Sequence, residues 1–178
     1  MTIKEKRREA AIERMADHLL EEGMAGASLR PLAKAAGTSD RMLVYYFGTR
    51  EALLAATLER VAARLRATLD AALPVGERLP PAALLAALWT VAGSPALQPF
   101  MRLWIELAAA AVARREPELS VAGAILDGFA AWISARLEGQ PGPAHDRATA
   151  SLFATLEGAL LFNAVGRREF AEAAIPPA

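Results

Sequence analysis

Apolar side chains recur with the spacing of an α-helix along almost the whole chain, and this periodicity constrains the fold more than any other feature. In residues 4–22 they fall at i, i+3, i+4, i+7 and i+8, which is the stripe of an amphipathic helix. The members of this stripe are Ile12, Met15, Ala16, Leu19 and Leu20. The strict alternation typical of a half-buried strand is absent. The sequence therefore predicts an all-α protein.

Glycine and proline divide the helical pattern into segments. We expect the first helices at about 4–22, 28–36, 39–47 and 50–73. Later helices are expected at 82–92, 97–115, 118–138 and 145–168, with a frayed tail over 174–178. Ser28 and Ser39 stand where N-caps are expected, because a serine hydroxyl can accept a hydrogen bond from the first turn of a helix. A chain of 178 residues suits one domain or two small domains that share a core.

Composition excludes several kinds of site. The chain has no cysteine, so a disulfide framework, a thiolate zinc site and a cysteine nucleophile are ruled out. Its two histidines, His18 and His145, lie far apart, and Glu106 and Asp127 stand isolated in helical segments. We therefore expect no metal, no cofactor and no enzymatic activity. The charged start and the short apolar runs predict a cytoplasmic protein without a membrane span.

Positive charge is concentrated near the N-terminus, although the formal net charge of the chain is zero. Between residues 28 and 50 four basic side chains stand against Asp40 alone, and residues 1–8 hold four more against Glu5. These basic residues are Arg30, Lys34, Arg41, Arg50, Lys4, Lys6, Arg7 and Arg8. The two patches indicate either a nucleic-acid contact or two solvated faces, and charge alone does not decide between them.

The segment 28–47 has the form of a helix-turn-helix. Two short predicted helices are joined at Gly37, and the second begins with a polar edge from Thr38 to Arg41. Leu43 and Phe47 follow at i and i+4, so they can anchor that helix to its neighbours. Such a helix presents its N-terminal residues to base edges in the DNA major groove.

In this region the sequence resembles the TetR family of bacterial transcription regulators. The resemblance covers about residues 7–61 and is carried by "LAKAAGTS", by the aromatic end of the recognition helix, and by "FGTREALLAATLERV". It implies a helix-turn-helix DNA-binding domain at 1–49 and a helical ligand-binding and dimerisation domain at 50–178. It also implies a ligand-responsive repressor that binds a near-palindromic operator as a homodimer.

The resemblance places DNA contacts on particular residues of this chain. Arg30 and Arg41 are candidates for base reading, because arginine can bind guanine O6 and N7 together. Arg50 stands where the family usually has a phosphate-binding lysine. The full set is Ser28, Arg30, Lys34, Thr38, Ser39, Asp40, Arg41, Tyr45, Tyr46 and Arg50.

One residue departs from the family pattern. Val44 occupies a position that is usually tyrosine, and valine cannot donate a hydrogen bond to phosphate. Either Tyr45 or Tyr46 takes over this contact, or DNA affinity is reduced. The departure leaves open an alternative, in which the chain is a helical small-molecule-binding protein or an adaptor with a weakened or vestigial DNA-reading head.

The C-terminal two-thirds carries no motif of its own. Aromatic and apolar residues of the middle helices are candidates for a small, mostly apolar effector, namely Trp89, Phe100, Met101, Trp104 and Phe129, with Arg102, Glu106 and Asn163 as polar contacts. The alternative for these residues is ordinary core packing. The last two long helices are expected to form the dimer contact, through Leu126, Ile133, Ala154, Gly158 and Leu161.

Overall fold

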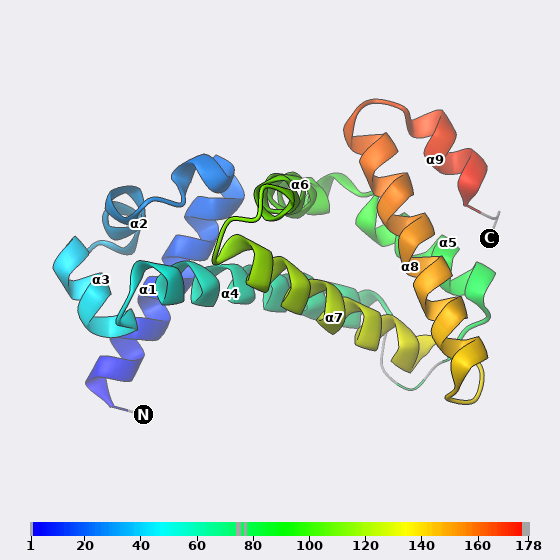
Figure 1. Ribbon diagram of the computed structural model, residues 1–178, viewed down its shortest axis with the longest axis horizontal. Helices are drawn as coiled ribbons and strands as arrows, with labels where there is room; N and C mark the ends of the chain where they lie inside the picture. The colour runs from blue at the N-terminus through cyan, green and yellow to red at the C-terminus, as the bar shows by residue number, and fades with distance from the viewer. Residues whose placement is uncertain (1, 74–75, 77, 176–178) are drawn as a thin grey trace. The chain divides into compact units, whose positions relative to one another are not determined.

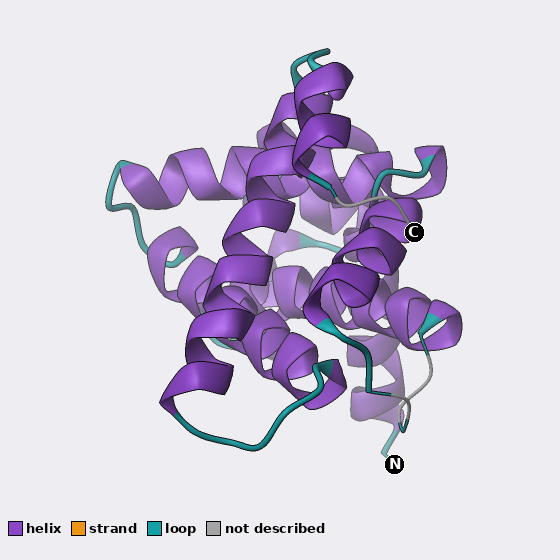
Figure 2. Cartoon of the chain, turned by 90° about the vertical axis from the view of Figure 1, so that its right-hand side faces the viewer, coloured by secondary structure: helices purple, strands orange, loops and turns teal. Residues whose placement is uncertain are grey.

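A computed structural model describes residues 2–73, 76 and 78–175. Within these residues every regular element is a helix, and no strand occurs (Figures 1 and 2). The first four helices are α1 (Ile3–Glu22), α2 (Leu29–Ala36), α3 (Asp40–Phe47) and α4 (Arg50–Ala72), with the 3-10 turn η1 (Gly23–Gly26) after α1. The remaining elements are α5 (Pro81–Ala92), η2 (Pro95–Leu97), α6 (Gln98–Val112), α7 (Glu118–Arg136), α8 (Pro143–Ala164) and α9 (Arg168–Ala174). The predicted all-α class is confirmed.

The helices form two compact units. Unit 1 contains residues 1–64 and 102–125, and unit 2 contains residues 65–101 and 126–178. Packing therefore groups the first part of α4 and most of α6 with the helix-turn-helix. The functional boundary between residues 49 and 50 stays a prediction.

Unit 1 is built around the apolar stripe of α1. Met15 and Leu19 are fully buried, and they share the interior with Leu32 of α2, Leu43 of α3 and Leu54 of α4. Each of these side chains lies on the inner face of its helix at helical spacing, so the amphipathic pattern of four short segments is buried in a single core. This core holds α2 and α3 in place on α1.

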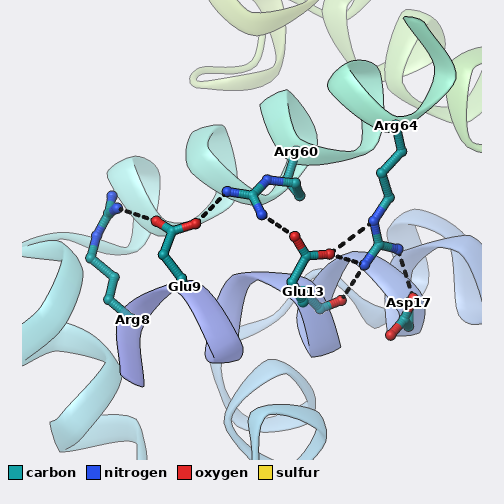
Figure 3. Close-up of polar contacts among 6 residues, drawn as sticks. All are labelled: Arg8, Glu9, Glu13, Asp17, Arg60 and Arg64. Carbon is teal, nitrogen blue, oxygen red and sulfur yellow. Dashed lines mark hydrogen bonds and ion pairs between the residues drawn. The ribbon is translucent and has the colours of Figure 1, made fainter. Parts of the chain in front are cut away.

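A chain of ion pairs joins α4 to α1 on the surface of unit 1 (Figure 3). Arg60 binds Glu9 at 2.5 Å and also Glu13, while Arg64 binds Glu13 and reaches Asp17 at 2.6 Å. The hydrogen bond from Arg64, aided by Arg60, lowers the pKa of Glu13 against the opposing effect of burial. The ion pairs set the position of this part of α4 along α1.

Unit 2 has its own apolar core, formed mainly by α5, the second half of α7, α8 and α9. Leu84, Leu88 and Leu137 are among its fully buried members. The guanidinium of Arg136, almost fully buried, donates to Asp70 Oδ1 at 2.5 Å and to the carbonyl of Leu73 at 3.0 Å. A buried charge is tolerated here because it is paired and hydrogen-bonded.

The chain after residue 164 differs from the prediction. The last expected helix, 145–168, ends at Ala164, where Gly166 takes a positive φ of 77°, and a separate helix α9 follows. The sequence there lacks proline, and Gly166 alone was not read as a stop. The residues expected to fray are described only up to Ile175, so residues 176–178 lie outside the described part.

The two residues of α7 expected at the dimer contact differ in burial. Val121, Ala122, Trp132 and Ile133 are buried, whereas Leu126 is exposed.

Helix α7 is long and apolar enough to cross a membrane, judged by length and composition alone. Helix α5 and the segment 95–112 satisfy the same criterion when they are taken together as one bent span. Core helices of soluble proteins satisfy this criterion as well, so one or two such helices are weak evidence for a membrane protein.

Candidate nucleic-acid interface

The turn between α2 and α3 is closed by local hydrogen bonds. Gly37 has a left-handed φ of 68°, and its N–H together with that of Thr38 donates to the last carbonyls of α2. Arg14 of α1 donates to the Ala36 carbonyl at 2.9 Å. The Ser39 hydroxyl accepts from the Met42 N–H at 3.3 Å and so caps α3. Ser28 makes no such side-chain bond at the start of α2.

One side of helix α3 packs into the protein interior, and another side is exposed to solvent. Leu43 is fully buried and Phe47 half-buried, as their i, i+4 spacing predicts. Asp40 and Arg41 are exposed at the start of the helix. The exposed edge continues one turn later with Val44, 43% exposed, and Tyr45, 61% exposed.

The basic side chains of residues 1–64 fall into two groups. Arg8, Arg60 and Arg64 are ion-paired, and Arg14 is bonded to the end of α2. In the described structure no carboxylate pairs with the other seven, which are Lys4, Lys6, Arg7, Arg30, Lys34, Arg41 and Arg50. These seven lie on the first turns of α1 and α4 and on α2 and α3. Their charge is available to an anionic partner.

A surface groove of about 800 Å³ runs beside this edge. It is lined by His18, Arg30, Pro31, Ala33, Lys34, Ala35, Thr38 and Asp40. Four of the predicted DNA-contacting residues, Arg30, Lys34, Thr38 and Asp40, therefore share one concave surface. Asp40 supplies its only carboxylate, at the N-terminus of α3, where negative charge is favoured.

The remaining predicted DNA contacts do not line the groove. Tyr46 is half-buried, and its ring packs beside that of Tyr45 with centroids 5.7 Å apart. Arg50 is exposed at the first residue of α4, a helix start that Thr49 caps by accepting the Ala52 N–H at 3.0 Å. A capped helix start with a basic side chain is a favourable place for an anion.

The five residues predicted to bind an effector are divided between the two units. Trp89 is buried in the core of unit 2, and Phe100, Met101 and Phe129 pack against that core. Trp104 belongs to unit 1. Asn163 is half-buried near the end of α8. The effector site on these residues stays a prediction.

Arg102 and Glu106 have a role that sequence reasoning missed. Arg102 Nη2 donates to the carbonyls of Leu20 and Glu21, both at 2.7 Å, and so binds the open C-terminal end of α1. Glu106 Oε2 accepts the N–H of Met24 at 2.5 Å. Both side chains come from α6 and bind the α1–α2 junction, and their predicted contact with an effector stays a prediction. Their i, i+4 spacing was the only signal in the sequence.

The residues predicted for dimerisation differ in accessibility. Leu126, Ala154 and Leu161 are exposed, and Gly158 is half-buried with open space where a Cβ would stand. Ile133 is only 2% exposed and lies inside the core of unit 2, so its side chain is not available to a partner. Among the described residues no group of three or more His, Asp or Glu side chains is placed to hold a metal ion.

Comparison with known proteins agrees with this geometry. Residues 12–57 match the family described as bacterial regulatory proteins, tetR family. No curated protein matches the sequence. Among solved structures, a protein assigned as a TetR-family transcriptional regulator from Rhodococcus sp. superposes with a TM-score of 0.71 at 22% identity, covering 96% of this chain and 97% of its own.

Two further solved structures are similar along nearly the whole length. One is a protein assigned as a transcriptional regulator from Pseudomonas aeruginosa PAO1, with a TM-score of 0.69 at 21% identity and coverage of 98% and 91%. The other is a transcriptional regulator from Rhodococcus sp. Rha1, with a TM-score of 0.68 at 25% identity and coverage of 98% and 92%. Residues 12–57 therefore carry the helix-turn-helix domain of the tetR family of bacterial regulatory proteins, and the whole chain has the fold of the solved transcriptional regulators.

Proposed function

We propose that this regulator is a repressor that binds a near-palindromic operator as a homodimer and is released by a small, mostly apolar effector. The proposal is carried by the unpaired basic side chains around the exposed edge of α3 and its groove. In the described part of the chain, seven cations without carboxylate partners lie on α1, α2, α4 and the recognition helix α3 itself. Phosphate neutralisation by such residues supplies much of the affinity of a DNA-binding protein.

The DNA contacts divide between base reading and backbone binding. Arg30 and Arg41 are exposed or half-exposed arginines on α2 and at the start of α3, and each can bind a guanine in bidentate fashion. Arg50 and Lys34 are placed for phosphates. A lost bidentate contact costs about 1–3 kcal/mol of discrimination, whereas a lost phosphate contact weakens all sequences alike.

Homodimerisation is supported by exposed apolar and small residues on two helices of unit 2. On α7 Leu126, Ala131 and Ala135 are exposed, and on α8 Ala154 and Leu161 are exposed. Small residues let a second pair of helices approach closely. Ile133 is left out of the proposed contact because it is buried. A two-fold dimer would present two recognition helices to half-sites about 34–36 Å apart or somewhat further.

Release by an effector would follow from linkage between two sites. A ligand that lowers operator affinity by some factor must itself be bound more weakly by the DNA complex, by the same factor. Repression is the sign of regulation typical of the family. The effector's apolar character is inferred from Trp89, Phe100, Met101 and Phe129, which pack in or against the core of unit 2.

The experiment is selection of bound sequences from random duplexes, followed by affinity titration of the selected site. We expect a near-palindromic site and a salt-dependent, sequence-selective affinity. Arg41→Ala should lose discrimination between the selected site and a base-substituted one, whereas Arg115→Ala, an exposed arginine outside the helix-turn-helix, should not. Absence of any selected sequence would reject the proposal.

The alternative is a helical small-molecule-binding protein or adaptor with a weakened reading head, and Val44 is the residue that favours it. Valine at an exposed position of α3 cannot bind phosphate. Binding of a ligand or a protein partner together with equal, weak affinity for all DNA sequences would support this alternative over the regulator.

A further inference from the structure

The first turn of α1 is a defined structural element. The Thr2 hydroxyl accepts the Glu5 N–H at 3.2 Å, and Glu5 Oε2 accepts the Thr2 N–H at 2.7 Å. This reciprocal pair is a capping box, which satisfies two backbone donors at a helix start. The basic N-terminal stretch is therefore helical from Ile3 onward, and Lys4 has a fixed position on the surface of unit 1.

The first two turns of α1 lie against the aromatic end of α3. The Lys4 ammonium stands 4.3 Å from the centroid of the Tyr45 ring. One turn later the Arg8 guanidinium stands 4.7 Å from the centroid of the Phe47 ring. Two cations at i and i+4 of one helix thus pack on two rings of another, which brings the start of α1 to the C-terminal end of the recognition helix.

The two cations differ in their charge partners. Arg8 also pairs with Glu9 at 3.5 Å, and Glu9 in turn binds Arg60, so its charge is already used within the protein. For Lys4 the described structure has no carboxylate partner. A ring face attracts an ammonium ion without neutralising it. Tyr45 therefore positions the charge of Lys4 and leaves it available.

The Lys4 ammonium packs on Tyr45, the residue that follows Val44, where the usual phosphate contact is missing. Val44 precedes Tyr45 on the exposed edge of α3 and offers no hydrogen-bond donor. Lysine carries three rotatable donors on a compact charge, and a phenol can donate one. We propose that Lys4, held over Tyr45, binds a backbone phosphate of DNA next to the end of α3 and so replaces the contact that Val44 cannot make.

This inference rests on the proposed DNA-binding function, and the test separates the two. The affinity of the protein for its selected duplex is measured between 50 and 200 mM salt for the wild type and for Lys4→Gln, Arg115→Gln, Lys4→Arg and Tyr45→Phe. Arg115→Gln is the matched control, because it removes one positive charge from an exposed residue of unit 1 that lies outside the helix-turn-helix and packs on no ring in the described structure.

Loss of one phosphate contact lowers the slope of log affinity against log salt by about 0.9. Over a fourfold change in salt this makes the fall in affinity roughly 3.5-fold smaller for Lys4→Gln than for the wild type. Arg115→Gln should leave the slope unchanged. Lys4→Arg keeps the charge and the ring contact, so it should restore the slope. Tyr45→Phe keeps the ring, so it should weaken binding without removing the contribution of Lys4 to the slope.

Equal slopes for Lys4→Gln and Arg115→Gln would overturn the inference, because the effect would then be one of net charge. So would a lower melting temperature of Lys4→Gln with an unchanged slope, which would give Lys4 a purely structural role. If the wild type selects a site, Arg41→Ala loses discrimination, and Lys4→Gln matches the wild type, only this inference fails. If the wild type selects no site, both fail.

Discussion

The contact between Glu106 and the α1–α2 junction allows a local prediction. Glu106 Oε2 accepts the Met24 N–H at 2.5 Å, and the contact is partly buried. The neighbouring Gly23 has a φ of 69°, and a Cβ there would stand 2.8 Å from Glu106 Oε1. The carboxylate therefore fills the space beside the glycine and holds the amide that follows it. Glu106→Ala removes both the side chain that fills this space and the acceptor of the hydrogen bond, whereas Glu106→Gln removes only the negative charge.

The expected change in the exchange rate of the Met24 amide follows from the type of hydrogen bond that each variant removes. A hydrogen bond to a charged group contributes about 1.5–3 kcal/mol, and a neutral one about 0.5–1.5 kcal/mol. At about 1.4 kcal/mol for each factor of ten, Glu106→Ala should speed exchange of the Met24 amide roughly 10- to 150-fold. Glu106→Gln should speed it by about 5-fold, corresponding to a difference of about 1 kcal/mol.

Amide hydrogen exchange followed by NMR measures this at the residue concerned. Glu59→Ala serves as the control, because Glu59 is an exposed glutamate of unit 1. Arg102→Ala should expose the carbonyls of Leu20 and Glu21 and act on the same junction, so its effect should not add to that of Glu106→Ala. Unchanged exchange of Met24 in Glu106→Ala, with the remaining amides as in the wild type, would refute the proposed role of this contact.

Three further predictions follow from the ion pairs and the exposed helices. The hydrogen bond with Arg64 lowers the pKa of Glu13. The contribution of Glu13 to stability should therefore be present above pH 4.5 and be lost as pH falls further. In denaturant titrations Glu13→Gln should remove about 0.2–1 kcal/mol of this pH-dependent stability. Asp70→Asn should destabilise unit 2 by about 1.5–3 kcal/mol, because it leaves the buried Arg136 without its carboxylate; an unchanged denaturation midpoint would count against it. Leu161→Glu, at a half-exposed residue of α8, should shift sedimentation from dimer to monomer, and an intact dimer would place the contact elsewhere.

The sequence predicted the local features of the reading head because they depend on near neighbours. Glycine at 37 permits the left-handed turn, Ser39 caps the helix that follows it, and Leu43 is buried at the expected register. Each of these follows from residues within one or two turns. The family match at 12–57 covers this same segment.

The features that sequence reasoning missed depend on partners far along the chain. Arg102 and Glu106 lie about 80 residues from the carbonyls and the amide that they bind. Ile133 and Leu126 share one helix and one chemical character, yet one is buried and the other exposed. Helical periodicity gives the width of an apolar face, whereas its orientation depends on the helices that pack against it.

The sequence by itself therefore determined that the chain is helical, where its helix-turn-helix lies and which family that segment matches. Only the tertiary structure decided which cations pair within the protein and which have no carboxylate partner among the described residues, and that Lys4 stands over Tyr45. The physical reason is that helix formation and capping are short-range. Burial and charge pairing, in contrast, depend on the packing of helices that are distant in the chain.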